Sequence, residues 1–304
     1  MPQKPLLVIV GPTAVGKTAL SLYLAHTFDI EIISADSRQI YQKFDIGTAK
    51  PTPEDLAAVP HHLVDTVAPN GMLTLAEFQE QAYATIANIH LRGRLPAMVG
   101  GTGQWVKAVV EGWGIPRVPP DYALRAELEV EAEVIGSEAF HGRLAQVDPQ
   151  AAAKLDYRNV RRVIRALEVY RITGVPISEL QQKKAPPYKI LQIGLTMPRE
   201  MLYERIDTRI DKMMEMGLLE ETRRLAEAGC EWNQPAMMGL GYRQIGQHVR
   251  GEISLDEAVG LIKKETRRFV RQQYNWFRLD DDRIRWFDVS ADLPTGVSMP
   301  LGTT

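Results

Sequence analysis

A glycine-rich segment near the start of the chain constrains its fold more than any other feature. Residues Gly11–Thr18 read GPTAVGKT and match the pattern G-x-x-x-x-G-K-[ST] in full. The apolar run Leu6–Val10 precedes it as a predicted strand, and a helical pattern from Thr18 to about Thr27 follows it. In this context the pattern predicts a phosphate-binding loop between a strand and a helix. We therefore expect the chain to bind a diphosphate or a triphosphate.

Each part of this loop has a physical role towards phosphate. Backbone N–H groups point at phosphate oxygens, the helix N-terminus adds its dipole, and Lys17 adds a positive charge. The hydroxyl of Thr18 is the expected protein ligand of a magnesium ion. The predicted diphosphate-binding residues of the loop are Gly11, Pro12, Thr13, Ala14, Val15, Gly16, Lys17 and Thr18.

The rest of the chain predicts an α/β fold, with a P-loop parallel sheet core and an inserted all-helical subdomain. Further strands are predicted at Glu31–Ala35, His61–Asp65, Leu95–Val99, Lys189–Thr196 and Arg283–Val289. Strands that alternate with helices at this spacing favour a parallel sheet. From Pro116 to Pro187 we find helix starts and stops but no good strand. We predict a core over residues 1–115 and 188–304, with C-terminal helices, and a helical insertion over 116–187.

Composition and charge narrow the class of protein. With 36 Lys+Arg against 38 Asp+Glu, the net charge of −2 excludes a strongly basic nucleic-acid coat but not a local basic patch. The single Cys230 excludes a disulfide framework and a cysteine-rich zinc site, and fits a reducing, cytoplasmic setting. No apolar run approaches the roughly 20 residues that a membrane helix needs. A monomer is the default expectation.

Two polar residues at predicted strand ends are candidates for chemistry. Asp36 follows Glu31–Ala35 and Thr102 follows Leu95–Val99, so both reach the sheet edge that carries the phosphate loop. Asp36 is either a solvated loop acid or a functional carboxylate, and its location favours the second role. Thr102 either caps the next helix or contacts a substrate, and both roles stay open.

A second acid for magnesium is not evident in the sequence. NTP-hydrolysing proteins usually present a carboxylate at the end of a neighbouring strand, but Leu95–Val99 ends in Gly100-Gly101-Thr102-Gly103. Asp65 is the alternative, at the end of a short strand. This weakens an ATPase interpretation and leaves room for an enzyme whose bound pyrophosphate is a leaving group.

Two predicted helices carry cations along one face. At about 100° per residue, the first set falls within an arc of about 140°: Lys263, Lys264, Arg267, Arg268, Arg271 and Arg278. The second set lies opposite apolar residues and consists of Arg158, Arg161, Arg162 and Arg165. Each set is either a solvated helix face or a surface for a polyanion. On a chain of nearly neutral net charge, we favour nucleic acid as the partner.

Together these motifs resemble the bacterial tRNA dimethylallyltransferase family, also called tRNA isopentenyltransferases. The resemblance spans nearly the whole chain. Besides the phosphate loop, its markers are Ser34–Tyr41, Asp45–Pro51, Gly100–Gly103, Arg161–Val169, Met238–Gln244 and Thr266–Arg268 running into Trp276. The pairing of the Asp36 segment with Asp45–Pro51 is its most specific part.

The resemblance implies transfer of a dimethylallyl group from dimethylallyl diphosphate to N6 of the adenosine 3′-adjacent to the anticodon in tRNA. The pyrophosphate held by the loop then leaves. The implied catalytic residues are Lys17, Asp36 as the acceptor of the N6 proton, and Thr102, which would help to hold the adenine. Arg223 is implied as a further cation for the pyrophosphate, and Mg²⁺ as the cofactor, with Thr18 as its ligand.

The implied partners are the tRNA anticodon stem-loop and dimethylallyl diphosphate. No association with a membrane is expected. The residues expected to bind tRNA are Asp36, Ser37, Arg38, Gln39, Arg125, Arg161, Arg162, Arg165, Gly241, Tyr242, Arg243, Gln244, Arg267 and Arg271.

Three other functions compete with this one. A P-loop small-molecule kinase and a relative that prenylates free adenine nucleotides would have no use for the two sets of cations. A non-catalytic RNA-binding ATPase would use them, but the lack of a clear second acid disfavours it.

Overall fold

A computed structural model of the chain describes residues 3–290 and divides them into two compact units. The first unit runs to Val110 and resumes at Pro187, and the second is the intervening Glu111–Pro186. The second unit begins five residues before the predicted insertion and ends one residue before the predicted end. No helix in the described part of the chain is long and apolar enough to cross a membrane.

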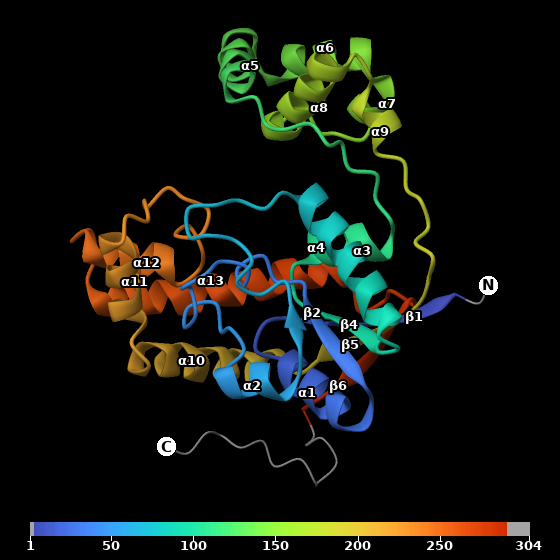
Figure 1. The fold of residues 1–304 in the computed structure, drawn as a ribbon. Coiled ribbons are helices and arrows are strands. Elements are labelled where there is room, and N and C mark those ends of the chain that lie inside the picture. Colours follow the sequence, from blue (N-terminus) through green and yellow to red (C-terminus); the bar gives the residue numbers. More distant parts are fainter. Residues whose placement is uncertain (1–2, 291–304) are drawn as a thin grey trace. The chain divides into compact units, whose positions relative to one another are not determined.

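Within the described residues, six strands form one parallel sheet in the order β3-β2-β4-β1-β5-β6 (Figure 1). They are β1 (Lys4–Val10), β2 (Ile30–Ser34), β3 (His61–His62), β4 (Leu95–Val99), β5 (Tyr188–Thr196) and β6 (Ile284–Asp288). The predicted α/β class is confirmed. The strand predicted over His61–Asp65 is shorter than expected, because Leu63 and Asp65 have φ angles of 60° and 55° that interrupt extended backbone.

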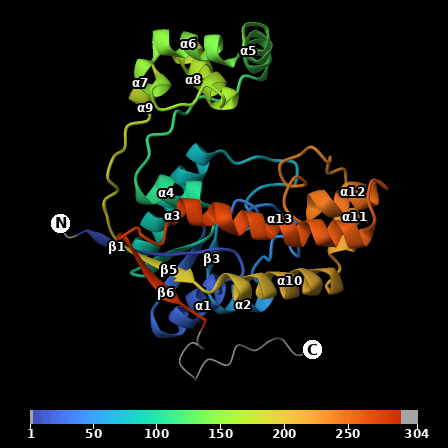
Figure 2. The ribbon, with the colours of Figure 1, turned by 180° about the vertical axis from the view of Figure 1, so that it is seen from behind.

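Helices cover both faces of this sheet. They are α1 (Lys17–Thr27), α2 (Pro53–Ala58), α3 (Leu75–Leu91), α4 (Gly103–Val110), α10 (Arg199–Glu215), α11 (Leu218–Glu227), α12 (Tyr242–Val249) and α13 (Leu255–Trp276). Leu6 and Val8 of β1 belong to the apolar cluster under α3, α4 and α13, three helices that Figure 2 labels. Leu7 and Ile9 belong to the cluster under α1. Burial on both faces explains why the core of β1 is apolar throughout instead of alternating.

Short signals in the sequence set several helix ends in this unit. Thr74 and Glu77 form a capping box at the start of α3, where each satisfies a backbone N–H of the other. Two helices, α10 and α11, follow one another closely in the chain. Gly217 separates the two helices with a φ angle of 98°, a conformation that glycine adopts without strain.

The second unit is wholly helical over residues 111–186. Its helices are α5 (Tyr122–Ile135), α6 (Ser137–Val147), α7 (Pro149–Ala152), α8 (Val160–Thr173) and α9 (Ile177–Leu180). Asp121 caps α5, Asp148 caps α7 and Gly174 ends α8. The unit has an apolar core of its own, which includes Leu128, Phe140, Leu144, Val163 and Leu167.

A buried carboxylate joins α5 to α8. Glu168 accepts hydrogen bonds from Arg125 at 2.8 and 2.9 Å, from Arg165 at 2.6 Å and from the backbone N–H of Asp121 at 2.8 Å. Burial pushes the pKa of Glu168 upward, but the hydrogen bonds from the two arginines outweigh it and leave the pKa lowered. Arg125 and Arg165 were predicted to bind RNA. Their guanidinium groups also stabilise this unit, because an unpaired buried carboxylate would be costly. Their contact with RNA stays a prediction.

Candidate active site

Three loops meet at the carboxyl edge of the sheet, because β4 lies between β1 and β2. The backbone N–H of Gly100 donates to Ile9, that of Ala35 donates to Val99 at 2.8 Å, and that of Thr102 donates to Ala35. A Cβ on Gly100 would lie 2.2 Å from the carbonyl oxygen of Ala35, so this approach requires glycine. The phosphate loop, the Asp36 loop and the loop after β4 are therefore held side by side.

A cavity of about 460 Å³ lies beside these loops in the first unit. The phosphate loop contributes Thr13 and Ala14, and the segments 36–49, 101–104 and 236–243 form further walls. Apolar side chains line another part of the cavity and come from α10 and α13: Ile206, Ile210, Met213, Ile262 and Phe269. The cavity thus joins a polar region beside the phosphate loop to an apolar region.

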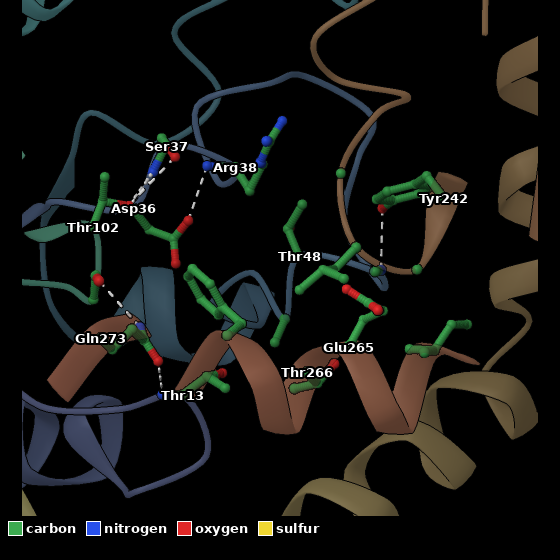
Figure 3. Close-up of a pocket in the computed structure, with 18 of the residues that line it drawn as sticks. Thr13, Asp36, Ser37, Arg38, Thr48, Thr102, Tyr242, Glu265, Thr266 and Gln273 are labelled. Atoms are coloured by element: carbon green, nitrogen blue, oxygen red, sulfur yellow. Dashed lines mark hydrogen bonds between the residues drawn. The ribbon is translucent and has the colours of Figure 1, made fainter. Parts of the chain in front are cut away.

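Asp36 and Thr102 both line the cavity, as their positions after β2 and β4 predict (Figure 3). One carboxylate oxygen of Asp36 accepts the backbone N–H of Arg38 at 2.9 Å. The hydroxyl of Thr102 accepts the backbone N–H of Ser37 at 3.0 Å and donates to the Ser37 hydroxyl at 3.3 Å. The Thr102 side chain therefore ties down the loop that carries Asp36, rather than capping α4.

Lys17 lies inside the curve of its own loop. Its ammonium group donates to the carbonyl oxygens of Gly11 at 3.0 Å and Pro12 at 2.8 Å. Burial lowers the pKa of Lys17 to about 8, while the nearby Asp36 carboxylate acts in the opposite direction and Arg209 adds to the lowering. Lys17, Asp36 and Arg209 are thus close enough to influence one another electrostatically.

The cation that lines the cavity from α10 is Arg209, which sequence reasoning missed. Burial lowers the pKa of Arg209, and the neighbouring Arg205 adds to this. Arg223, the cation implied by the resemblance, is exposed on α11 and does not line the cavity. Helical periodicity could have identified Arg209, because it follows the buried Ile206 by three positions and so lies on the same face of α10.

Gln273 is a second residue that sequence reasoning missed. Its buried side-chain amide accepts the backbone N–H of Thr13 at 2.8 Å and donates to the carbonyl oxygen of Gly101 at 3.1 Å (Figure 3). One side chain of α13 therefore fixes the phosphate loop against the loop after β4. Only tertiary contact reveals this role, because Thr13 and Gln273 are 260 positions apart in the chain.

The predicted row of cations on α13 does not form one basic face. Lys263 pairs with Asp211 at 2.6 Å, and Arg267 pairs with Asp207 of the adjacent α10. Within the row, Lys264, Arg268 and Arg271 remain exposed, and Arg268 lines the cavity. Arg278 lies beyond the end of α13 and pairs with Asp280 at 2.7 Å. The prediction for Arg267 overlooked the two acids that α10 presents one helical turn apart.

Several other residues predicted to bind tRNA point inward. Tyr242 and Gln244 are buried, and the Gln244 side chain accepts the backbone N–H of Gly241 at 3.0 Å. The amide of Gln39 accepts from Ser34 and donates to the Ala49 carbonyl. These side chains hold neighbouring backbone in place, and Tyr242 also lines the cavity. Their contact with tRNA stays a prediction.

Other predicted tRNA contacts stay accessible. Arg38 and Arg243 are exposed and line the cavity. Arg161 and Arg162 are exposed on α8 of the second unit. These four arginines, unlike the inward-pointing residues, remain available to a polyanion.

The groups that would hold Mg²⁺ are few. Within residues 3–290, no group of three or more His, Cys, Asp or Glu side chains is placed to bind a metal ion. The carboxylate of Asp65, the alternative second acid, is paired with Lys50 at 2.5 Å and does not line the cavity. Thr18 in the first turn of α1 and the Asp36 carboxylate on the cavity wall are two oxygen groups at this edge that could ligate the ion. Such a sparse set suits Mg²⁺, which takes most of its ligands from water and from a bound diphosphate.

This fold and site define an α/β protein with a phosphate loop and a carboxylate at the carboxyl edge of a parallel sheet. The family model "IPP transferase" matches residues 39–280. The chain is 56 % identical over 274 residues to a tRNA dimethylallyltransferase of Roseiflexus castenholzii, covering 90 % of each chain. It is 48 % identical over 296 residues to one of Dehalococcoides mccartyi, covering 97 % of this chain and 91 % of the relative.

Solved structures agree with these sequence matches. The tRNA isopentenylpyrophosphate transferase of Bacillus halodurans is 41 % identical, with a TM-score of 0.70 over 94 % of this chain and 90 % of its own. A eukaryotic dimethylallyltransferase acting on tRNA is 26 % identical, with a TM-score of 0.80 over 94 % of this chain and 74 % of its own. The chain belongs to the IPP transferase family, and the resemblance inferred from its motifs is confirmed.

The bridge made by Gln273 predicts a binding defect. We expect Gln273→Leu to weaken binding of inorganic pyrophosphate by about tenfold and to destabilise the protein by about 1–3 kcal/mol, since the N–H of Thr13 and the buried carbonyl of Gly101 lose their partner. Gln273→Glu keeps the acceptor for Thr13 and should bind better than the leucine variant. Calorimetric titration and denaturant unfolding measure the two effects. Asn275→Leu, at an exposed position of the same helix, is the control; equal affinities for all variants would contradict the role of the bridge.

Proposed function

We propose that this chain transfers a dimethylallyl group from dimethylallyl diphosphate to N6 of the adenosine 3′-adjacent to the anticodon in tRNA, releasing pyrophosphate. The main observation that supports this proposal is the position of the Asp36 carboxylate on the cavity wall, beside a complete phosphate loop, in a chain of the IPP transferase family. We also expect a cytoplasmic monomer.

The phosphate loop supports departure of the pyrophosphate. Breaking the allylic C–O bond places positive charge on carbon and negative charge on the leaving oxygen. Lys17, the backbone N–H groups of the loop and Arg209 stabilise that negative charge where it develops. Mg²⁺, held by Thr18 and diphosphate oxygens, would neutralise further charge on the leaving group.

Asp36 supports the other half of the reaction. As the bond from N6 to the allylic carbon forms, the amine nitrogen must lose a proton. The Asp36 carboxylate accepts this proton, and the C–O electron pair leaves with pyrophosphate, so charge and atoms balance. The Thr102 hydroxyl holds the Asp36 loop through Ser37 and contributes to the wall against which the adenine would lie.

The proposed acceptor must enter the cavity as a single base. An adenine inside a stacked loop cannot reach Asp36, so the base is expected to leave its stack. Arg38, Arg243 and Arg268, which line the cavity at exposed positions, suit the phosphates beside such a base. Arg161 and Arg162 of the second unit are proposed to contact the anticodon stem.

The direct test supplies each class of substrate separately. The purified chain is incubated with dimethylallyl diphosphate and unmodified tRNA, and the nucleosides are analysed by mass spectrometry. We expect a prenylated adenosine from tRNA, none from free AMP, and no requirement for ATP. Prenylation of AMP alone would favour a nucleotide prenyltransferase, and stoichiometric ATP consumption would favour a kinase.

Removal of the proposed base tests its role. We expect Asp36→Ala to lower turnover by ~10²–10⁴, the usual contribution of a positioned general base. Asp36→Asn should be nearly as damaging, because it keeps the shape and loses the basicity. Single-turnover rates measure the loss, and titration with dimethylallyl diphosphate checks that its binding changes little. Near-normal rates in both variants would exclude Asp36 as the proton acceptor.

The lowered pKa of Lys17 predicts a pH-dependent affinity. Below about pH 8 the free protein already carries the charged ammonium that a diphosphate needs, whereas above it binding must take up a proton. The Kd for dimethylallyl diphosphate should therefore rise between pH 7.5 and 9.5, by about twentyfold, as linkage requires. Calorimetry across this range measures it. Lys17→Met should bind weakly and lack this step; parallel pH curves for the two proteins would refute the assignment.

The exposed cations of α13 predict a salt effect on tRNA use. We expect replacement of Arg268 and Arg271 together by Gln to raise the KM for tRNA and to reduce its log–log salt slope by roughly one to two units. Turnover at saturating tRNA should survive. Arg267→Gln is the comparison, since Arg267 pairs with Asp207, and its slope should match that of the wild type. An unchanged slope in the double variant would mean that these arginines do not contact tRNA.

A further inference from the structure

The segment Asp45–Lys50 forms part of the cavity wall but has no role in the reaction described above. Gly47, Thr48 and Ala49 line the cavity directly. Ala49 has a φ angle of 48°, which non-glycine residues seldom adopt, so neighbouring structure must hold the segment in place.

Glu221, in the first turn of α11, holds this segment. Its buried carboxylate accepts the backbone N–H groups of Asp45 at 3.2 Å, of Ile46 at 3.0 and 3.2 Å, and of Gly47 at 3.3 Å. A buried carboxylate is costly unless donors surround it, and the N-terminal end of a helix also favours a negative charge. The conformation in which three successive N–H groups converge is therefore stabilised by Glu221.

Tyr242, in the first turn of α12, completes the arrangement. Its hydroxyl accepts the backbone N–H of Gly47 at 3.1 Å (Figure 3). The same hydroxyl donates to Glu221 at 2.5 Å. Burial raises the pKa of Tyr242 well above its usual value, and the adjacent Glu221 raises it further, so the phenol stays a neutral donor. A Cβ on Gly47 would lie 2.6 Å from two ring carbons of Tyr242, which explains the glycine there.

The segment is connected in turn to the strand end that carries Asp36. Gln39 donates to the carbonyl oxygen of Ala49 at 3.1 Å and accepts the hydroxyl of Ser34 at 3.0 Å. Ser34 ends β2 two residues before Asp36. Hydrogen bonds therefore run from Glu221 through the segment to the base of the Asp36 loop, without touching the phosphate loop.

We infer that Glu221 and Tyr242 are positioning residues, which act through the segment Asp45–Lys50 to place the wall and the carboxylate that face the acceptor base. This inference rests on the proposed function. The diphosphate side of the cavity is fixed separately, through Gln273. Removal of the Glu221 charge or of the Tyr242 hydroxyl should therefore lower the rate at which the enzyme modifies tRNA. Binding of the diphosphate substrate should stay intact.

The test compares three variants under the same conditions. Tyr242→Phe keeps the ring and removes both hydrogen bonds of the hydroxyl, and Glu221→Gln keeps the size and removes the charge. Glu31→Gln is the matched control, since Glu31 is also buried in the first unit but pairs with Arg92, away from the cavity. We expect kcat/KM for tRNA to fall roughly ten- to hundredfold in the first two variants, the cost of a small misplacement of reacting groups. The Kd for dimethylallyl diphosphate, measured without tRNA, should stay within about twofold of the wild type, because Lys17 and its loop are unchanged.

Amide hydrogen exchange supplies a readout independent of activity. Exchange should increase at residues 45–50 and 36–41 in Tyr242→Phe and Glu221→Gln, but not in Glu31→Gln. An unchanged kcat/KM in Tyr242→Phe, or an equal loss in the control at equal stability, would overturn the inference. Wild-type protein that modifies no tRNA would instead overturn the proposed function, so the two failures are distinguishable.

Discussion

The close approach of three backbone segments at the carboxyl edge of the sheet determines where every candidate reactive group lies. Gly100 packs directly on the carbonyl of Ala35, leaving no room for a side chain between them. Because β4 separates β1 from β2, this contact brings the phosphate loop, Asp36 and Thr102 to one cavity. The strand order thus converts three distant parts of the sequence into neighbours, as parallel sheets generally do at this edge.

The two sides of the cavity are held by different buried side chains. Gln273 bonds the phosphate loop to the loop after β4, and Glu221 with Tyr242 bonds the opposite wall. In each case a side chain from the C-terminal half satisfies backbone groups of the N-terminal half. Such contacts fix loops that have little regular structure of their own, and preorganised groups of this kind stabilise developing charge with little rearrangement.

The arginines show where prediction from periodicity succeeds and where it stops. Periodicity correctly placed the cations of α13 and α8 away from the apolar faces of these helices. It could not tell Arg271, which is exposed, from Arg267, which pairs with Asp207 on α10. The same limit applies to Arg165, which pairs with the buried Glu168 together with Arg125. An acid on another helix is invisible to a helical-period argument, because the pairing depends on which helices pack together.

The local sequence determined the phosphate loop, the α/β class, the helical insertion and the positions of Asp36 and Thr102. Each of these follows from a short motif or from hydrophobic periodicity, which act over a few residues. Only the tertiary structure decided that Arg209 rather than Arg223 lines the cavity, and that Gln273 and Glu221 hold its walls. These roles depend on contacts between residues far apart in the chain, and such contacts exist only once the helices have packed on the sheet.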